Sequence, residues 1–113
     1  MRRNGHKFNA VRTEVDGITF ASKAEAKRYC ELKLSVKAKR IAHLEHQPVF
    51  PLIVNGVKVG KYVADFRYVV LPWDYEEPVT VVEDVKGMKT PVYRLKKKLV
   101  EAQYGITITE ITT

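Results

Sequence analysis

Apolar and polar residues follow a helical pattern from about residue 22 to residue 39. The stretch SKAEAKRYCELKLSVKAK is rich in Ala, Leu, Lys and Glu, which are strong helix formers. Ser22 is a favoured N-cap residue, and Glu25, three positions later, completes a capping box with it. The pattern therefore predicts a helix that begins next to Ser22. Its lysines are expected on the outward face: Lys23, Lys27, Lys33, Lys37 and Lys39.

The pattern changes to that of β-structure from about residue 46 to residue 70. Asn55-Gly56 is a strong hairpin signal, and it separates an entering strand from a long exit strand that runs to about residue 70. Alternate side chains of the exit strand share a face. One face is predicted to hold Tyr62, Ala64, Phe66 and Tyr68, and the other Val63, Asp65, Arg67 and Val69. Asp16-Gly17 predicts a short hairpin before the helix, and VTVVEDVKG (79–87) predicts a further strand.

A second helix is predicted between Thr90 and Gly105. Thr90 is an N-cap residue, Pro91 occupies the first helical position, and Gly105 ends the helix. A final strand, ITITEI (106–111), follows. The buried stripe of the helix is expected to consist of Val92, Leu95, Leu99 and Ala102, with Arg94, Lys97 and Lys98 facing away.

The order of these elements predicts a single α/β domain over residues 20–113. It contains a helix, three strands, a second helix and a last strand, which is an α-β-β-β-α-β order. A mixed central sheet flanked by helices is the expected architecture. Residues 1–19 are expected to form a basic N-terminal arm that includes the short hairpin.

The charge balance favours a polyanionic partner. The chain has 113 residues, and 20 Lys and Arg against 13 Asp and Glu give a net charge of +7. Phosphates bind clustered basic side chains with release of counterions. A basic surface without such a partner is the alternative. No apolar run approaches the roughly 18 residues of a membrane span, so no membrane partner is expected. The single cysteine, Cys30, excludes an intrachain disulfide framework.

Candidate chemistry lies on the strand predicted over residues 79–87. Asp84 and Lys86 are two positions apart, so their side chains project from one face, whereas Glu83 takes the other. Asp65 interrupts an aromatic-rich strand, where aspartate is disfavoured. If the two strands are neighbours, Asp65 and Asp84 lie side by side, which raises a pKa or requires a cation. Hard oxygen ligands in this arrangement suit Mg²⁺ or Mn²⁺.

Two structural alternatives stay open for these residues. One aspartate can pair with Lys86 at the sheet surface while the other pairs with Arg67. Glu25 would join the aspartates by leaning from the first turn of its helix toward the sheet, but the capping box also explains it as a structural residue.

Several phrases of the chain resemble a known superfamily. Glu25 on the first helix, Asp65 in YVADFRY and then EDVKG follow the order of the acids in PD-(D/E)xK nucleases, which have the restriction-endonuclease-like fold. FASKAEAKRYCELKL, LEHQPVFPL, YVADFRY and VVEDVKGMKTPVYRLKKKLV are similar to small phage and prophage proteins placed in that superfamily. The resemblance runs from about Phe20 to the C-terminus, and it implies a restriction-endonuclease-like fold for this single domain.

The resemblance implies a role for each candidate residue. Asp65 and Asp84 would bind the metal ion, and Lys86 would be the active-site lysine. Glu25 would be the helix-borne acid that serves as a further ligand or contacts a metal-bound water.

Two positions depart from the family pattern. Ala64 stands where the motif has its proline, and Asp84 stands where glutamate is commoner. Glu83 is an alternative to Asp84 if a bulge shifts the strand by one residue. Gln47 is a second open candidate for a place in the site.

The same resemblance implies a function. We expect a Mg²⁺- or Mn²⁺-dependent DNA endonuclease of phage or prophage origin, acting in the cytoplasm of a bacterial host. Branched DNA such as a Holliday junction is the expected substrate, and a homodimer is expected by analogy. The basic residues expected to contact DNA are Lys23, Lys27, Arg94, Lys97, Lys98, Arg2 and Arg3. A non-catalytic nucleic-acid-binding module with the same fold and charge is the alternative.

Overall fold

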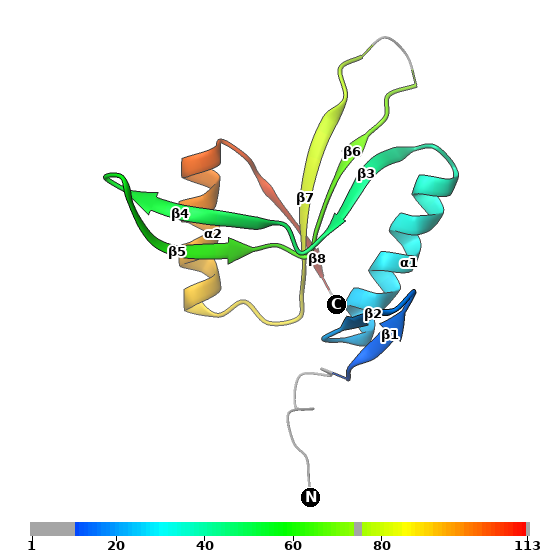
Figure 1. Ribbon diagram of the computed structural model, residues 1–113, viewed down its shortest axis with the longest axis horizontal. Helices are drawn as coiled ribbons and strands as arrows, with labels where there is room; N and C mark the ends of the chain where they lie inside the picture. The colour runs from blue at the N-terminus through cyan, green and yellow to red at the C-terminus, as the bar shows by residue number, and fades with distance from the viewer. Residues whose placement is uncertain (1–10, 74–75, 113) are drawn as a thin grey trace, which may run out of the picture.

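The computed structural model describes residues 11–73 and 76–112 (Figure 1). In chain order the elements are β1 (Thr13–Val15), β2 (Ile18–Phe20), α1 (Lys23–Lys37), β3 (Ile41–His46), β4 (Val49–Val54), β5 (Val57–Val63), β6 (Phe66–Val70), β7 (Val79–Lys86), α2 (Pro91–Tyr104) and β8 (Ile108–Thr112). The predicted short hairpin is formed by β1 and β2. The first ten residues of the predicted basic arm, including Arg2 and Arg3, lie outside the described residues.

Four strands form a mixed central sheet in the order β3-β6-β7-β8. Strand β6 pairs antiparallel with both β3 and β7, whereas β8 runs parallel to β7. A parallel neighbour requires a crossover connection, and α2 supplies it by carrying the chain from the end of β7 to the start of β8. The prediction of a small α/β domain with a mixed sheet and two helices is therefore confirmed at this level.

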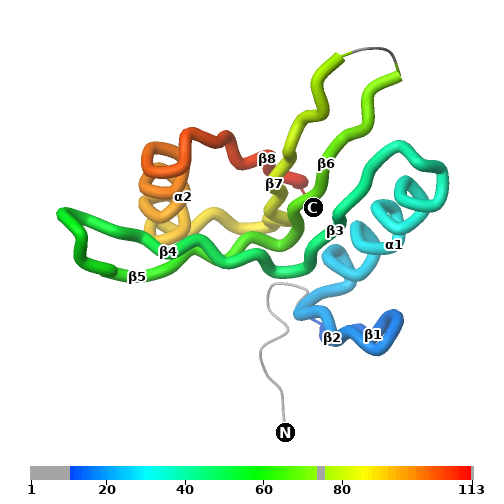
Figure 2. The backbone as a smooth tube through the Cα atoms, turned by 45° about the horizontal axis from the view of Figure 1, so that its top comes forward, coloured from blue at the N-terminus to red at the C-terminus, as the bar shows by residue number. Residues whose placement is uncertain are grey.

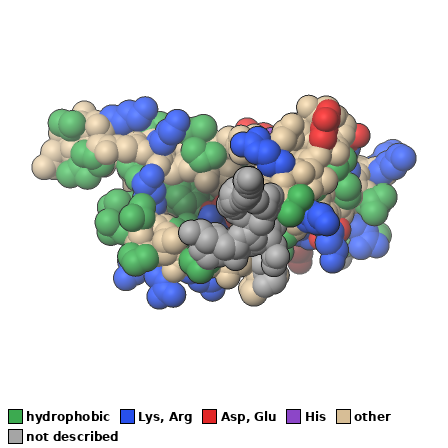
Figure 3. All heavy atoms as spheres, turned by 90° about the horizontal axis from the view of Figure 1, so that it is seen from below, with side chains coloured by type: hydrophobic (Ala, Val, Ile, Leu, Met, Phe, Trp, Pro, Cys, Tyr) green, Lys and Arg blue, Asp and Glu red, His purple; other side chains and the backbone are tan. Residues whose placement is uncertain are grey.

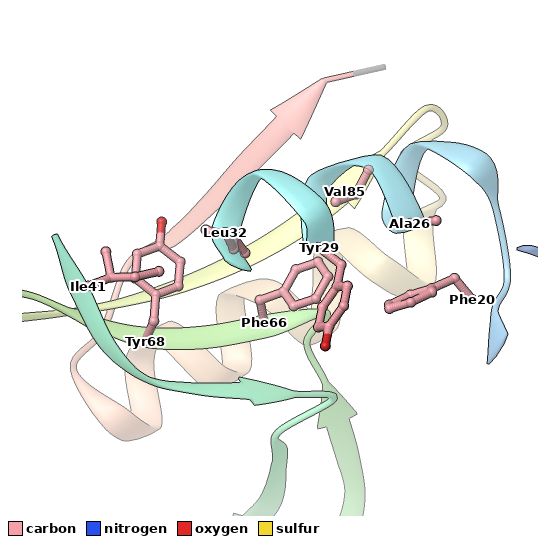
Figure 4. Packing of buried hydrophobic residues seen from close by; sticks show 8 residues of the cluster. All are labelled: Phe20, Ala26, Tyr29, Leu32, Ile41, Phe66, Tyr68 and Val85. Atoms are coloured by element: carbon pink, nitrogen blue, oxygen red, sulfur yellow. The ribbon is translucent and has the colours of Figure 1, made fainter. Parts of the chain in front are cut away.

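Two buried clusters, one on each face of the sheet, form the core. The cluster under α1 contains Phe20, Ala26, Tyr29, Leu32, Ile41, Phe66, Tyr68 and Val85 (Figure 4). The cluster beside α2 contains Phe50, Leu52, Tyr62, Ala64, Val82, Tyr93, Val100 and Ile108. Strand β7 contributes Val85 to the first cluster and Val82 to the second, because side chains an odd number of positions apart point to opposite faces. Figures 1 and 2 accordingly show α1 and α2 on opposite sides of the sheet.

The prediction of a single exit strand over residues 57–70 is wrong, because the chain bends at Ala64 and Asp65. Before the bend β5 pairs with β4, and after it β6 pairs with β3. The opposing chain bends at the same level, where Gln47 has a φ of 57° and precedes Pro48. Two backbone hydrogen bonds hold the bend: Gln47 N–H to the Asp65 carbonyl (2.9 Å) and Ala64 N–H to the Pro48 carbonyl (3.1 Å).

The bend also divides one predicted face of this strand between the two clusters. All four residues of that face are buried: Tyr62, Ala64, Phe66 and Tyr68. The first two pack beside α2, and the last two pack under α1. Asp65 therefore lies where the chain passes from one cluster to the other, between two halves of a bent ribbon.

Strand β3 was not predicted from the sequence. Its pairing with β6 shifts register between Ala42 and Glu45, and His43 between them has a φ of 56°. This bulge interrupts the alternation of apolar and polar side chains that signals a strand. With β3 and the divided exit strand, five strands rather than three separate the two helices.

Both helices begin at the predicted N-cap residues, and α2 also ends at the predicted Gly105, whereas α1 ends at Lys37, two residues before its predicted end. Ser22 Oγ accepts a hydrogen bond from the Glu25 backbone N–H (3.2 Å) at the start of α1. Thr90 Oγ1 accepts one from the Tyr93 backbone N–H (3.1 Å) at the start of α2, and Gly105 ends α2 with a φ of 66°. Within residues 11–73 and 76–112, no helix is both long enough and apolar enough to span a membrane.

The predicted buried stripe of α2 is wrong. Tyr93 and Val100 are the buried residues of this helix. The predicted stripe lies on the exposed side instead: Val92, Leu95, Leu99 and Ala102. Tyr93 and Val100 are two helical turns apart and so share a face, but four aliphatic residues on another face dominate the periodic pattern.

Candidate active site

The bend between β5 and β6 places Asp65 beside the end of β7. Phe66 is paired with Glu83 in the antiparallel register, so Asp65 comes opposite Asp84. The Asp65 backbone N–H donates to the Glu83 carbonyl (3.0 Å), and Asp65 Oδ2 accepts from the Val85 backbone N–H (2.6 Å). The prediction that the two aspartates lie on neighbouring segments of the sheet is therefore confirmed.

Asp84 is a buried acid that lacks hydrogen-bond partners among the described residues. Its side chain is 1% exposed, and neither carboxylate oxygen has a partner in that part of the chain. Burial raises the pKa of Asp84 to about 6, although the positive charge of Lys86 and the nearby backbone N–H of Asp65 act in the opposite direction. Ionising an unpaired buried carboxylate is costly, and a bound cation is one way to satisfy it.

Lys86 lies half-buried at the end of β7, and its Nζ is 4.4 Å from the centre of the Tyr93 ring. The ion pairs formed among the described residues do not include it. Arg67 does not pair with Asp65 either, because its guanidinium binds Glu45, with Nη2 and Oε1 2.8 Å apart. Neither salt bridge of the structural alternative is formed.

Glu25 forms the predicted capping contact, and its carboxyl also feels the charges of the other candidate residues. Its backbone N–H binds the N-cap residue Ser22, so the capping role is confirmed. Its side chain is half-buried, and burial raises the pKa of Glu25. The charge of Asp65 raises that pKa further and that of Asp84 adds a smaller increase, whereas Lys86 lowers it. The Glu25 carboxyl therefore lies in the electric field of all three other candidate residues.

Three elements thus bring acids toward one end of the sheet. Burial raises the pKa of Asp65 as it does those of Glu25 and Asp84, while the Val85 N–H and Lys86 lower it. Across residues 11–73 and 76–112, no group of three or more His, Cys, Asp and Glu side chains is arranged to hold a metal ion. A pair of carboxylates still fits Mg²⁺, because this ion keeps several waters in its shell. Asp84 is the better candidate ligand of the two, because neither of its oxygens has a hydrogen-bond partner among the described residues.

Glu83 faces the other side of β7, where its carboxylate is fully used. It is 1% exposed and accepts hydrogen bonds from Arg28 Nε (2.8 Å) and Nη2 (2.6 Å), and one from the Tyr68 hydroxyl. Burial, followed by the bond to Glu83, raises the pKa of Tyr68 to about 12. The pairing of β6 with β7 is regular as far as Glu83, so the alternative that a bulge turns Glu83 into the site is wrong.

Gln47 and His46 approach the site from the bend opposite Asp65. Gln47 contacts Asp65 through its backbone N–H, and its side chain is exposed. The His46 ring packs against Phe20 and Phe66, with centroid distances of 4.9 and 5.8 Å. Burial lowers the pKa of His46, while the charge of Asp65 acts in the opposite direction. Both residues therefore shape the bend that carries Asp65.

Two residues beside the acids were not predicted, Glu110 and Tyr93. Glu110 is the register partner of Asp84 on β8, and the Tyr93 hydroxyl donates to Glu110 Oε2 (2.7 Å). A signal for Glu110 was available, because it alternates with the buried Ile108 and so points to the face of the α2 cluster. Tyr93 had no such signal, since its position depends on which face of α2 is buried.

A family model matches nearly the whole chain. Residues 5–112 match the model described as "Protein of unknown function (DUF1064)". The chain belongs to the DUF1064 family. Comparison with curated proteins and with solved structures gave no match.

The basic residues of this DUF1064 chain lie on both helices that flank the acids. Lys23 and Lys27 are exposed on α1, and Arg94 and Lys98 are exposed on α2, as predicted. Lys97 is half-buried instead, and its Nζ lies 3.7 Å from Glu110 Oε2. In the view from below in Figure 3, Lys and Arg side chains are spread over both halves of the visible face.

Proposed function

We propose that this protein is a divalent-metal-dependent endonuclease that hydrolyses phosphodiester bonds in DNA. The observation that supports this best is the convergence of Glu25 from α1, Asp65 from the bend and Asp84 from β7, with Lys86 beside them. Their order along the chain is that of the PD-(D/E)xK nucleases, which the sequence resembles. A mixed sheet between two helices is compatible with a restriction-endonuclease-like fold.

Asp65 and Asp84 are the proposed ligands of Mg²⁺ or Mn²⁺. Both oxygens of Asp84 are unpartnered within the described residues, whereas Asp65 has one oxygen bound to the Val85 N–H. When bound, the metal would activate a water and offset charge on the scissile phosphate. The two aspartates must lose their protons to bind it. Because burial raises their pKa values, they lose these protons at a higher pH than exposed acids do.

Lys86 and Glu25 have separate proposed roles. The ammonium of Lys86, not engaged in any ion pair among the described residues, would stabilise negative charge that develops on the phosphate. The carboxyl of Glu25 has a raised pKa and is half-buried beside Asp65, so it would hold or accept a proton near the attacking water. The exposed lysines of both helices would bind backbone phosphates without reading sequence.

We propose that the protein is of phage or prophage origin, that its substrate is branched DNA, and that its active form is a homodimer. These proposals rest on the resemblance, since symmetric cuts in two strands require two sites related by a two-fold axis. Light scattering of the purified protein with and without a four-way junction measures the number of subunits. A single subunit on the junction would contradict the dimer.

Cleavage of fluorescent four-way and linear DNA in Mg²⁺, Mn²⁺ or EDTA tests the function. We expect metal-dependent cutting that Asp65→Asn and Asp84→Asn each reduce by about 10²-fold or more, because each removes a charged ligand. Glu45→Gln is the matched control, since Glu45 is an acid of the same sheet that binds Arg67 and not the site. Cutting that survives Asp84→Asn, or that Glu45→Gln abolishes equally, contradicts the assignment.

A nucleic-acid-binding module without catalysis is the second candidate function. The observation that favours it is that no three-residue metal-binding group is arranged among the described residues. Tight, salt-sensitive DNA binding with no cutting in either metal would support this candidate and refute the endonuclease. Cutting in either metal refutes the second candidate.

A further inference from the structure

The ammonium of Lys86 is held by an aromatic ring rather than by an acid. Its Nζ lies 4.4 Å from the centroid of the Tyr93 ring, well inside the roughly 6 Å at which a cation is attracted to a ring face. The ion pairs of the described residues leave Lys86 out, although its charge acts on the pKa values of Glu25, Asp65 and Asp84. The ring therefore fixes where this charge lies relative to the acids.

Tyr93 is fixed at its backbone, its ring and its hydroxyl. Its backbone N–H donates to Thr90 Oγ1 (3.1 Å) in the first turn of α2. Its ring is 8% exposed and belongs to the cluster that includes Val82 and Ile108 on the neighbouring strands. Its hydroxyl donates to Glu110 Oε2 (2.7 Å). A ring held in these three ways cannot move without disturbing α2, β7 or β8.

Glu110 is neutralised by two other lysines. It is the register partner of Asp84 on β8, so it lies on the strand next to β7 and on the same face of the sheet as Lys86. Lys89 Nζ lies 3.1 Å from Glu110 Oε1, and Lys97 Nζ lies 3.7 Å from Oε2. With the Tyr93 hydroxyl, these contacts occupy the Glu110 carboxylate. Glu110 is thus prevented from drawing the ammonium of Lys86 away from the aspartates.

We propose that Tyr93 is a positioning residue for Lys86, and that Glu110 orients its ring. The inference rests on the proposed function for one point only, namely that Lys86 acts on the phosphate. The ring holds the ammonium beside Asp65 and Asp84 without forming the salt bridge that would neutralise it. An acid in place of the ring would instead compete with the phosphate for the same charge.

The position of the Lys86 ammonium can be measured by NMR, without a cleavage assay. A cation over a ring face places the Lys86 ε-methylene protons in the shielding cone of the ring, so their NMR signal moves upfield. We expect this upfield shift in the wild-type protein and its loss in Tyr93→Leu. Tyr93→Phe keeps the ring but not the bond to Glu110, and we expect a smaller shift than in the wild type. Tyr104→Phe is the control, because Tyr104 is also on α2 and donates a 2.7 Å hydrogen bond, but to the Pro51 carbonyl.

Cleavage kinetics test whether Tyr93 acts through Lys86. We expect Tyr93→Leu to lower kcat about tenfold with little change in KM for DNA, because a misplaced charge weakens transition-state stabilisation more than binding. In a Lys86→Ala background the same substitution should have no further effect on kcat. If Tyr93→Leu fails to fold, the kcat of Tyr93→Phe is compared in the same way, with and without Lys86→Ala.

The outcomes separate this inference from the proposed function. An ε-methylene signal that is unshifted in the wild type, or unchanged in Tyr93→Leu, overturns the positioning role. An equal loss of kcat with and without Lys86 also overturns it, since Tyr93 would then act on the fold. A wild-type protein that cuts no DNA but shows the upfield shift and its loss in Tyr93→Leu refutes the endonuclease while supporting the contact.

Discussion

At the scale of single residues, adjacent acids of β7 differ in their partners and not in their burial. Glu83 and Asp84 are both 1% exposed. Glu83 is satisfied by Arg28 and Tyr68, whereas Asp84 has no hydrogen-bond partner among the described residues. Burial alone therefore does not distinguish the proposed metal ligand from its neighbour. The missing partner does, because a buried carboxylate is normally paired or bound to a cation.

Asp84 is expected to make folding stability depend on pH. Burial raises its pKa from the usual 3.8 to about 6, so the folded protein holds this proton more tightly than the unfolded chain. The contribution of this proton to the free energy of unfolding is complete below pH 4. It is lost as pH rises through 6, and the loss amounts to about 3 kcal/mol. In EDTA, Asp84→Asn should therefore stabilise the protein above pH 6 but not below pH 4. Urea unfolding at several pH values measures the difference.

Glu45→Gln provides a control with the opposite sign. The hydrogen bond from Arg67 lowers the pKa of Glu45, so this acid contributes stability above its unfolded pKa and loses it as pH falls. Its substitution should thus be slightly destabilising at neutral pH and neutral in acid. A constant difference between Asp84→Asn and wild type from pH 4 to pH 8 contradicts the buried-charge account of Asp84.

Arg28 should matter far more to stability than Arg67, although each pairs with a glutamate through two hydrogen bonds. Arg28→Ala leaves the fully buried Glu83 without its cation, which costs about 3–5 kcal/mol. Arg67→Ala breaks a pair whose side chains are 33% and 47% exposed, which costs at most about 1 kcal/mol. Denaturant midpoints of the two variants give the comparison. Equal losses would show that burial does not decide the strength of these pairs.

The positions of Asp65 and Asp84 on neighbouring parts of the sheet could be predicted from the sequence, because local patterns determine them. Strand alternation separates Asp84 and Lys86 from Glu83, and Asp65 is conspicuous as an acid among aromatic residues. The partners of Glu83 could not be predicted, since Arg28 lies 55 positions away and the contact depends on how α1 crosses the sheet. Likewise, the bond of Tyr93 to Glu110 exists only once α2 has packed.

At the scale of elements, local signals located the starts of both helices and the end of α2, but not the face that α2 buries. Caps such as Ser22, Thr90 and Gly105 act within a few residues, and all are confirmed. The bend at Asp65 and the buried face of α2 depend on the packing of distant strands. Apolar periodicity chose the aliphatic side of α2, whereas the fold buries Tyr93 and Val100.

Two truncations on α2 distinguish these faces. Val100→Ala removes methyl groups from a side chain that is 0% exposed, and we expect a loss of about 2 kcal/mol. Leu95→Ala shortens a side chain that is 60% exposed, and we expect a change within about 0.5 kcal/mol. Thermal or urea unfolding measures both. A larger loss for Leu95→Ala would show that another surface covers the aliphatic side of α2 in solution.

At the scale of the whole molecule, basic residues would offset the repulsion between the acids and the proposed DNA substrate. The net charge is +7, although three acids converge at the end of the sheet. Exposed lysines and arginines lie on α1 and α2, which are on opposite sides of the sheet (Figure 1). Because Glu25 is in the first turn of α1, Lys23 and Lys27 are close to it along the helix, whereas Lys37 is in the last turn. The position of a charge along α1 should therefore decide its effect on DNA binding.

The salt dependence of DNA affinity measures that effect directly. If about six phosphates are contacted, affinity for a duplex in EDTA should fall about 10³-fold between 50 and 200 mM salt. Lys23→Gln and Lys27→Gln should each reduce the slope of log K against log salt by about 1, because each removes one phosphate contact. Lys37→Gln is the control on the same helix and should leave the slope unchanged. Fluorescence anisotropy gives all four slopes. An equal decrease in slope for all three variants would mean that net charge attracts DNA to the whole surface. It would contradict preferential binding of phosphates at the end of the sheet.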